Sequence, residues 1–523
     1  MSLYGTGSRT SRSEIARLAP ATRGPESMAE VSIGDRTRAG LKWTTLGMVS
    51  VRLSRFGANV VLAHLLARDA FGVMAMANAV IAVAGSLREA GIGQAYVQRE
   101  DRAEDRPREA IDTVFALSLA VNVALTALLF AAAPFAASLV TDEAATVQPV
   151  LRALALLFLL DAFDSTPRFL LQRAMRFDLI ARSEFLGAAA NAVTAIGSAA
   201  LGAGVWSLVL GYVADKAATT ASLVLGSGWR PGAGASRRMA RELLAFGKFL
   251  WGFALVRSIG GVLDRVVVGR RYGSSRLGDY SLAYQLCTLP SNAIAQLVNR
   301  VSLPAMSRMQ SDPERLRAAF LKSLGHVAFL AVPLAAGLIV ISDLLVPVVY
   351  GEKWLGMVPL VQVLALYGML VSVASVCGPV LQAVGRPGIF FTTEIARQGA
   401  LVALLVAFAS RGEVAVAWSV VAAFGVVTGP AFLVVVRMIG LRTPDVVPPL
   451  TGCVASAAAM YGSVRLVRSG LGDVLSAPLL LGAAVLTGLV SYAVLSLVLN
   501  RSLAREFLQT VRQVGGSRAP AVD

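Results

Sequence analysis

Val150–Glu184 reads VLRALALLFLLDAFDSTPRFLLQRAMRFDLIARSE, and Leu360–Glu394 reads LVQVLALYGMLVSVASVCGPVLQAVGRPGIFFTTE. At an offset of 210 residues the stretches share identical apolar and polar positions: Leu154, Ala155, Leu156, Leu171, Gln172, Arg176 and Glu184 meet Leu364, Ala365, Leu366, Leu381, Gln382, Arg386 and Glu394. Apolar composition alone would not produce the polar matches. A shorter match, at an offset of 205, pairs Gly47, Val51, Arg52 and Asn59 with Gly252, Val256, Arg257 and Asp264. The sequence therefore contains an internal repeat.

The surrounding chain is built for a membrane. Of its 523 residues 56% are hydrophobic and 15% are charged, whereas soluble domains carry roughly 25% charge. Spanning the hydrocarbon layer takes about 20 apolar residues. Fourteen runs of suitable length are predicted, at 41–66, 70–90, 110–139, 146–166, 178–201, 203–226, 243–268, 278–299, 318–341, 356–381, 388–410, 413–436, 448–467 and 475–499. The expected fold is an all-α polytopic membrane protein.

The repeat divides these spans. Its two copies are six spans apart, and an even separation inserts both in the same orientation, as in transporters built from parallel repeats. We expect an N-lobe at 41–226, a cytoplasmic linker at 227–242 and a C-lobe at 243–437. Two extra spans are expected at 438–500. A basic disordered cytoplasmic tail is expected at 1–40 and a second cytoplasmic tail at 501–523. The first tail has no apolar core, so it is not a cleaved signal peptide.

The net charge of +16 reflects topology. The N-terminal tail, the loops after even-numbered spans and the C-terminal tail hold 28 of the 48 Lys and Arg residues, whereas loops after odd-numbered spans hold 7. The positive-inside rule then places both termini in the cytoplasm. This distribution explains the charge without a nucleic-acid partner.

Charged residues within spans are candidate site residues, because they normally face a cavity or a partner. Arg52, Arg55 and Asn59 have the spacing of one helix face, and Arg257 is the repeat counterpart of Arg52. Guanidinium groups bind phosphate through paired hydrogen bonds, so these four residues are candidates for binding a diphosphate or sugar. Structural ion pairs with Asp161, Asp164 or Asp264 are the alternative for Arg52 and Arg257.

Carboxylates form the second candidate group, for ion coupling or charge pairing: Asp161, Asp164, Asp264, Glu184 and Glu394. For the two glutamates, a place near a helix start is the simpler explanation, because a carboxylate there suits the helix dipole. The sequence has no P-loop, HExxH, CxxC or GxSxG motif. We therefore expect a transporter, not an enzyme, with no cofactor and no metal.

Five stretches carry a family resemblance: AHLLARDAFGVMAMANAVIAV (Ala63–Val83), GIGQAYVQRED (Gly91–Asp101), LDRVVVGRRYGSSRLGDYSLAYQL (Leu263–Leu286), LLQRAMRFDLIARSE and GRPG (Gly385–Gly388). They resemble the bacterial Wzx-type polysaccharide flippases of the multidrug/oligosaccharidyl-lipid/polysaccharide exporter superfamily. The resemblance covers roughly residues 35 to 440. The long arginine-rich N-terminal tail departs from the family's short one.

The resemblance implies two six-helix lobes in a V-shaped bundle that alternates between inward-open and outward-open states. It also implies transfer of undecaprenyl-diphosphate-linked oligosaccharide to the outer leaflet of the inner membrane, with the lipid tail in the bilayer, for exopolysaccharide, capsule or lipopolysaccharide synthesis. A polysaccharide polymerase and export machinery are the expected partners. Arg52, Arg55 and Arg257 match the family's cationic cleft residues by position.

Two other functions fit the same superfamily. A cation-coupled multidrug exporter would need a carboxylate-rich cavity, whereas the charges placed deepest in the first lobe are arginines. A peptidoglycan-precursor (lipid II) flippase also uses intramembrane arginines and extra C-terminal spans.

Overall fold

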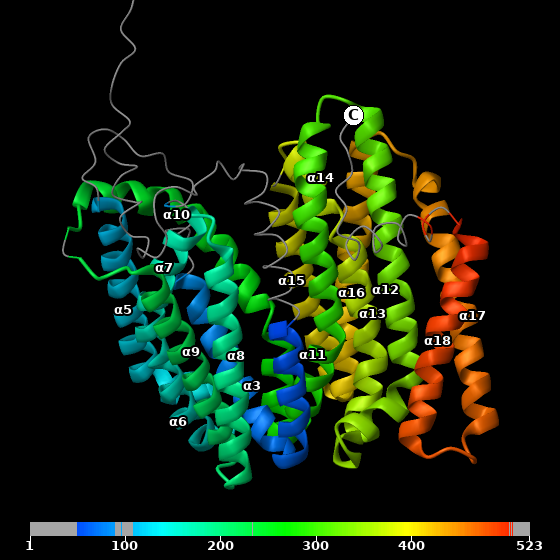
Figure 1. The fold of residues 1–523 in the computed structure, drawn as a ribbon, viewed down its shortest axis with the longest axis horizontal. Helices are drawn as coiled ribbons and strands as arrows, with labels where there is room; N and C mark the ends of the chain where they lie inside the picture. Colours follow the sequence, from blue (N-terminus) through cyan, green and yellow to red (C-terminus); the bar gives the residue numbers. More distant parts are fainter. Residues whose placement is uncertain are drawn as a thin grey trace, which may run out of the picture. The chain divides into compact units, whose positions relative to one another are not determined.

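The computed structural model describes residues 50–88, 96, 108–232, 234–386, 388–501, 503 and 505. This part of the chain is helical and contains no β-strand (Figure 1). The expected tail at 1–40 and most of the expected tail at 501–523 lie outside the described residues. The all-α fold predicted from the sequence is confirmed.

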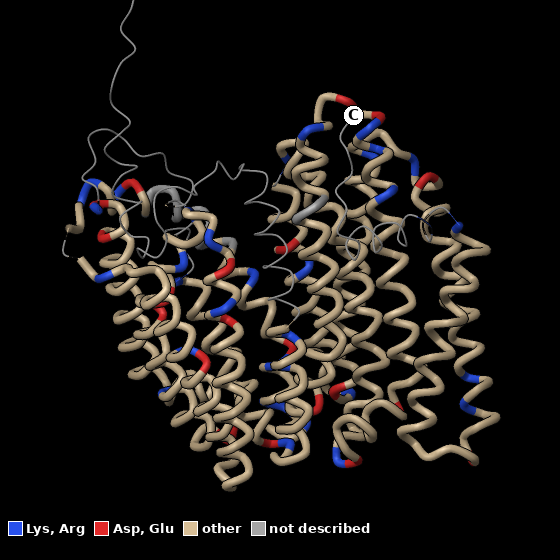
Figure 2. The backbone as a smooth tube through the Cα atoms, viewed as in Figure 1, with Lys and Arg blue, Asp and Glu red and all other residues tan. Residues whose placement is uncertain are grey.

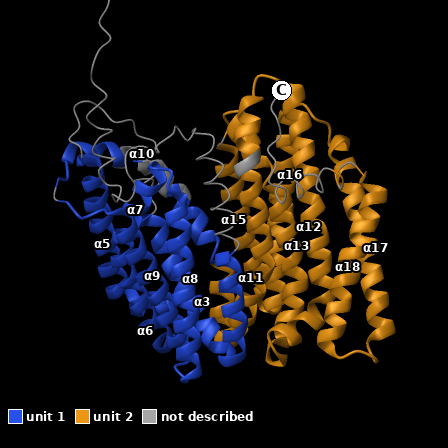
Figure 3. Ribbon diagram, viewed as in Figure 1, with its two compact units in different colours: residues 1–262 blue, residues 263–523 orange. Residues whose placement is uncertain are grey.

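The chain divides into two compact units, Met1–Val262 and Leu263–Asp523 (Figure 3). This contact-based boundary falls after the helix α10 (Arg237–Gly260), whereas the sequence-based boundary falls before it, in the linker at 227–242. Helix α10 packs against α3 (Arg68–Arg88) and α5 (Glu109–Val140), which both belong to the first unit.

The described part of the first unit contains a helix over residues 50–65, followed by α3 and α5. It then contains α6 (Ala144–Ala155), α7 (Leu157–Arg173), α8 (Phe177–Ala200), α9 (Val205–Ser227) and α10. Helices α8 and α9 approach each other closely because glycines lie where they meet. A Cβ atom on Gly211 would lie 2.8 Å from the Cβ of Ala195, and one on Gly187 would lie 2.0 Å from Thr219 Oγ1.

The second unit starts with α11 (Leu263–Arg308), which is interrupted at Gly273, where φ is 81°. It continues with α12 (Pro313–Val349), η1 (Glu352–Met357), α13 (Val358–Ala374), α14 (Cys377–Ala383), α15 (Gly388–Phe408), η2 (Ala409–Arg411) and α16 (Glu413–Met438). After η3 (Thr443–Val446), the two extra helices α17 (Pro448–Leu471) and α18 (Ala477–Leu499) pack on each other and on α12. The predicted span 243–268 is wrong as a single helix, because α10 ends at Gly260 and α11 begins at Leu263.

Ten helical segments of the described chain are long and apolar enough to cross a membrane, which makes this a multi-pass membrane protein. Helix α18, for example, carries no charged residue and is uncharged throughout in Figure 2. The other four predicted spans correspond to the helix 50–65, α8, α10 and α11. These four helices hold six of the nine candidate site residues: Arg52, Arg55, Asn59, Glu184, Arg257 and Asp264.

The backbone confirms the repeat at an offset of 210 residues. Helix α7 ends at Arg173 and α14 at Ala383, and each is followed by a residue with positive φ, Met175 (57°) and Gly385 (71°). The amide of Arg176 donates to the Leu171 carbonyl over 2.8 Å, and the equivalent bond from Arg386 to Leu381 spans 2.9 Å. Both turns are thus the same Schellman motif.

Candidate functional site

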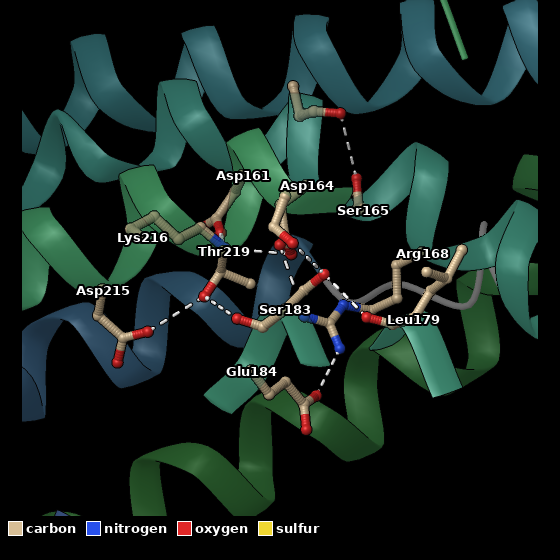
Figure 4. Close-up of polar contacts among 12 residues, drawn as sticks. Asp161, Asp164, Ser165, Arg168, Leu179, Ser183, Glu184, Asp215, Lys216 and Thr219 are labelled. Atoms are coloured by element: carbon tan, nitrogen blue, oxygen red, sulfur yellow. Dashed lines mark hydrogen bonds and ion pairs between the residues drawn. The ribbon is translucent and has the colours of Figure 1, made fainter. Parts of the chain in front are cut away.

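A cluster of charged side chains lies in the interior of the first unit and is centred on α7. Asp161 and Asp164 are one turn apart and are both buried, with 8% and 7% of their surface exposed. Arg168 lies a further turn along the same helix, so the three side chains project toward the same neighbours. Figure 4 shows these side chains converging with others from α8 and α9.

Three other helices supply the partners. Lys216 of α9 forms ion pairs with Asp161 and, over 3.2 Å, with Asp164 Oδ2. Arg88 of α3 pairs with the other Asp161 oxygen. Arg168 Nη1 lies 2.7 Å from Glu184 Oε1 of α8 (Figure 4), and its Nη2 lies 3.5 Å from Asp164 Oδ1. We call these six residues the charge network: Arg88, Asp161, Asp164, Arg168, Glu184 and Lys216.

The charge network contains three acids and three bases, so its formal charge is zero. An isolated charge within a membrane is expensive, and one that is paired and hydrogen-bonded costs much less. Each carboxylate therefore stabilises a cation that would otherwise be unfavourable in the bundle. The network also ties α3, α7, α8 and α9 together through polar contacts that depend on charge.

A second ion pair attaches the helix 50–65 to α9. Arg55 Nη2 lies 2.9 Å from Asp215 Oδ2, and Thr219 donates to the other Asp215 oxygen over 3.2 Å. The Arg55 side chain is 52% exposed, whereas that of Asp215 is 17% exposed. Part of the Arg55 guanidinium therefore stays accessible while its position is set by Asp215. Asp215 and Lys216, adjacent in sequence, have separate partners because consecutive helical residues point in different directions.

None of the contacts described above joins the other predicted substrate-binding residues, Arg52, Asn59 and Arg257, to the charge network. Arg52 and Asn59 lie on the same continuous helix as Arg55 and are half-buried, and Arg257 is exposed near the end of α10. Asp161 and Asp164 pair with Arg88, Lys216 and Arg168. Pairing of these carboxylates with Arg52 or Arg257, the alternative given above, stays a prediction.

The helix-start explanation for Glu184 and Glu394 is wrong. Both lie beyond the first turn of α8 and α15, where the helix dipole has little effect. Each instead binds an arginine: Glu184 binds Arg168, and Glu394 binds Arg397 through two contacts of 2.5 and 3.3 Å. Asp264 lies in the first turn of α11. It is buried and accepts a 2.7 Å hydrogen bond from Tyr280.

Sequence reasoning did not identify Arg88, Arg168 and Lys216 as the partners of the carboxylates. Each of these residues lies in or beside an apolar run. Such a position indicates that the charge is buried, but it does not indicate which carboxylate binds it. Among the described residues, no three His, Cys, Asp or Glu side chains form a group that could hold a metal ion. The three cysteines are buried and free.

Comparison with known proteins places this geometry in context. A family model described as "Polysaccharide biosynthesis protein" matches residues 61–359. The succinoglycan biosynthesis transport protein ExoT of Rhizobium meliloti is 27% identical over 92% of this chain and 96% of its own. The lipopolysaccharide biosynthesis protein WzxC of Escherichia coli is 27% identical over 70% of this chain and 73% of its own. The teichuronic acid biosynthesis protein TuaB of Bacillus subtilis is also 27% identical, over 69% and 74%.

Solved structures match the fold. The lipid II flippase MurJ, in an inward closed conformation, has a TM-score of 0.72 at 15% identity and covers 88% of this chain and 99% of its own. An inward-facing multidrug transporter of the MATE family has a TM-score of 0.60 at 17% identity, covering 74% and 97%. These likenesses concern the fold alone.

Proposed function

The chain belongs to the polysaccharide biosynthesis protein family, and on that premise we propose that it is a flippase for lipid-linked oligosaccharide. It would carry an undecaprenyl-diphosphate-linked glycan from the inner to the outer leaflet of the bacterial inner membrane, with both termini in the cytoplasm. The product would supply exopolysaccharide, capsule or lipopolysaccharide synthesis, with a polysaccharide polymerase and export machinery acting next. The relatives named for succinoglycan, lipopolysaccharide and teichuronic acid synthesis support a glycan cargo.

The observation that carries the proposal is the half-exposed Arg55 guanidinium held by Asp215 in a membrane protein. Asp215 contacts the Arg55 guanidinium through Nη2, which leaves other N–H donors for a second anion, and a diphosphate suits the planar fork. We assign diphosphate or sugar contacts to Arg52, Arg55, Asn59 and Arg257. The charge network, being neutral and built around two buried aspartates, would keep α9 and therefore Asp215 in place.

Export by alternating access requires two bodies that can move, and the two repeat-related units would serve as these bodies. The carboxylates Asp161, Asp164 and Glu184 act as charge partners in this scheme. Because each already holds a cation, they are poor candidates for attracting a cationic drug. This favours the glycan flippase over a multidrug exporter.

The test uses a strain that lacks the protein and is complemented with variants. Arg55→Ala should abolish surface polysaccharide while the protein still inserts at normal levels. The second unit offers a matched control, because Arg276 pairs with Glu413 over 3.0 Å with side-chain exposures of 50% and 17%, against 52% and 17% for Arg55 and Asp215. Arg276→Ala should retain export. Full export by Arg55→Ala, or equal loss in both variants, contradicts the role of Arg55.

Two further assays separate the alternatives. Overexpression that raises resistance to cationic drugs without restoring polysaccharide would favour a multidrug exporter. Rescue of a strain depleted of its lipid II flippase would favour peptidoglycan precursor as the cargo. The proposed function expects neither result.

A further inference from the structure

Three aromatic rings from three helices form a continuous row in the second unit. Tyr284 of α11 and Tyr367 of α13 have ring centroids 5.8 Å apart. Tyr367 meets Phe424 of α16 edge to face, at 5.6 Å. All three residues are partly exposed. We call them the aromatic row.

A guanidinium lies beside the first and the last ring of the aromatic row, and the buried ring of Tyr280 stacks on Tyr284 with centroids 6.4 Å apart. That of Arg265 lies 4.6 Å from the ring centroid of Tyr284, and that of Arg397 lies 6.0 Å from the centroid of Phe424. Glu394 holds Arg397 through both carboxylate oxygens. The Nε atom of Arg265 is buried and has no hydrogen-bond acceptor among the described residues. The row therefore combines apolar ring surfaces with charged donors and acceptors.

The equivalent positions of the first unit lack this chemistry. At the repeat offset of 210, Leu157 stands where Tyr367 is, and Gly187 stands where Arg397 is. No side chain fits at Gly187, because its Cβ would lie 2.0 Å from Thr219 Oγ1 and 2.4 Å from Asp215 Oδ1.

The second unit likewise lacks most of the charge network of the first unit. Three positions of the charge network, Asp161, Asp164 and Arg168, correspond to Val371, Ala374 and Gly378. A feature needed only to fold the repeated unit would be expected in both copies. The charge network and the aromatic row each occur in one, so the two units differ in chemistry on a shared backbone.

We propose that the aromatic row, together with the Arg397–Glu394 pair, is the subsite for the glycan of the transported lipid. This inference rests on the proposed flippase function. The flat C–H face of a pyranose packs on aromatic rings, while its hydroxyls hydrogen-bond to a guanidinium and a carboxylate. An alkyl chain would use the rings but would leave the Arg397–Glu394 pair unused. The mixture of rings and charged groups therefore selects sugar over the lipid tail.

Binding measurements on the full-length protein in nanodiscs test this subsite. The probes are undecaprenyl diphosphate and the lipid-linked oligosaccharide extracted from a strain without its polysaccharide polymerase. Tyr367→Leu, which introduces the residue of the first unit, should weaken binding of the glycosylated lipid about tenfold, equivalent to about 1.4 kcal/mol. Binding of undecaprenyl diphosphate should stay within about twofold. Tyr367→Phe keeps the ring and is the matched control.

The outcomes separate the two claims. Wild-type protein that binds neither lipid refutes the flippase function. Wild-type protein that binds both lipids equally refutes the glycan subsite alone. The subsite is also refuted if Tyr367→Leu leaves both affinities unchanged or lowers both equally. Phe424→Leu provides a second variant at the other end of the row, should Tyr367→Leu fail to fold.

Discussion

Replacing Lys216 with methionine should destabilise the first unit, and a second substitution should restore most of the loss. Lys216→Met leaves Asp161 and Asp164 with one cation each and gives the charge network a net charge of −1. Adding Asp164→Asn removes the excess charge. Two complete pairs then remain, Arg88 with Asp161 and Arg168 with Glu184.

The contacts set the magnitude. Removing one partner of a buried ion pair costs about 3–5 kcal/mol, and the side chains of Lys216 and Asp164 are only 23% and 10% exposed. Because both aspartates keep an arginine, the lower limit of about 3 kcal/mol applies to Lys216→Met. Asp164→Asn should cost about 2 kcal/mol, as for the loss of a hydrogen bond to a charged group, because Lys216 keeps Asp161 and Arg168 keeps Glu184. The free energy of unfolding of the double variant should also fall by about 2–3 kcal/mol, whereas two independent substitutions would lower it by the sum of their separate effects, about 5 kcal/mol.

Titration of the purified protein with SDS, followed by far-UV circular dichroism, gives the free energy of unfolding of all four proteins. The expected coupling energy between the two substitutions is about 2–3 kcal/mol. Additive losses, within about 0.5 kcal/mol, would show that Lys216 and Asp164 do not act on each other. Lys216→Arg is the control that keeps the charge, and it should stay closer to the wild type than Lys216→Met does.

Two other predictions concern backbone positions. Met175 and Gly385 both have positive φ, which glycine adopts more easily than other residues. Met175→Gly should therefore stabilise the protein by up to about 1 kcal/mol, and Gly385→Ala should destabilise it by about 1–2 kcal/mol. Measured free energies of unfolding should shift in opposite directions for the two variants, and shifts of the same sign would contradict the prediction. The Gly234 amide donates to Asp112 Oδ2 over 3.1 Å, and a Cβ there would lie 2.7 Å from that oxygen. Gly234→Ala should therefore speed hydrogen exchange at this amide, whereas exchange unchanged from the wild type would show that the bond is not needed.

The repeat shows how far sequence reasoning reaches. The identities at Gln172 and Arg176 predicted equivalence with Gln382 and Arg386, and the structure shows the same helix-ending turn at both. At the matched position Met175 adopts a conformation that usually requires glycine. The sequence alone would not have revealed it, because only the shared hydrogen bonds impose that conformation. The shorter match at an offset of 205 did not extend to helix boundaries, since α10 ends at Gly260 while the helix 50–65 continues past the equivalent Arg55.

The sequence by itself determined the helical membrane fold, the two-unit repeat and the presence of charges within the spans. These properties follow from run length, periodicity and identity along one dimension. Only the tertiary structure decided which charges meet: Asp215 and Lys216 are neighbours in sequence but bind Arg55 and the α7 aspartates respectively. It also decided that the charge network belongs to the first unit and the aromatic row to the second. The physical reason is that each such contact joins side chains from different helices, and helix packing sets their distances.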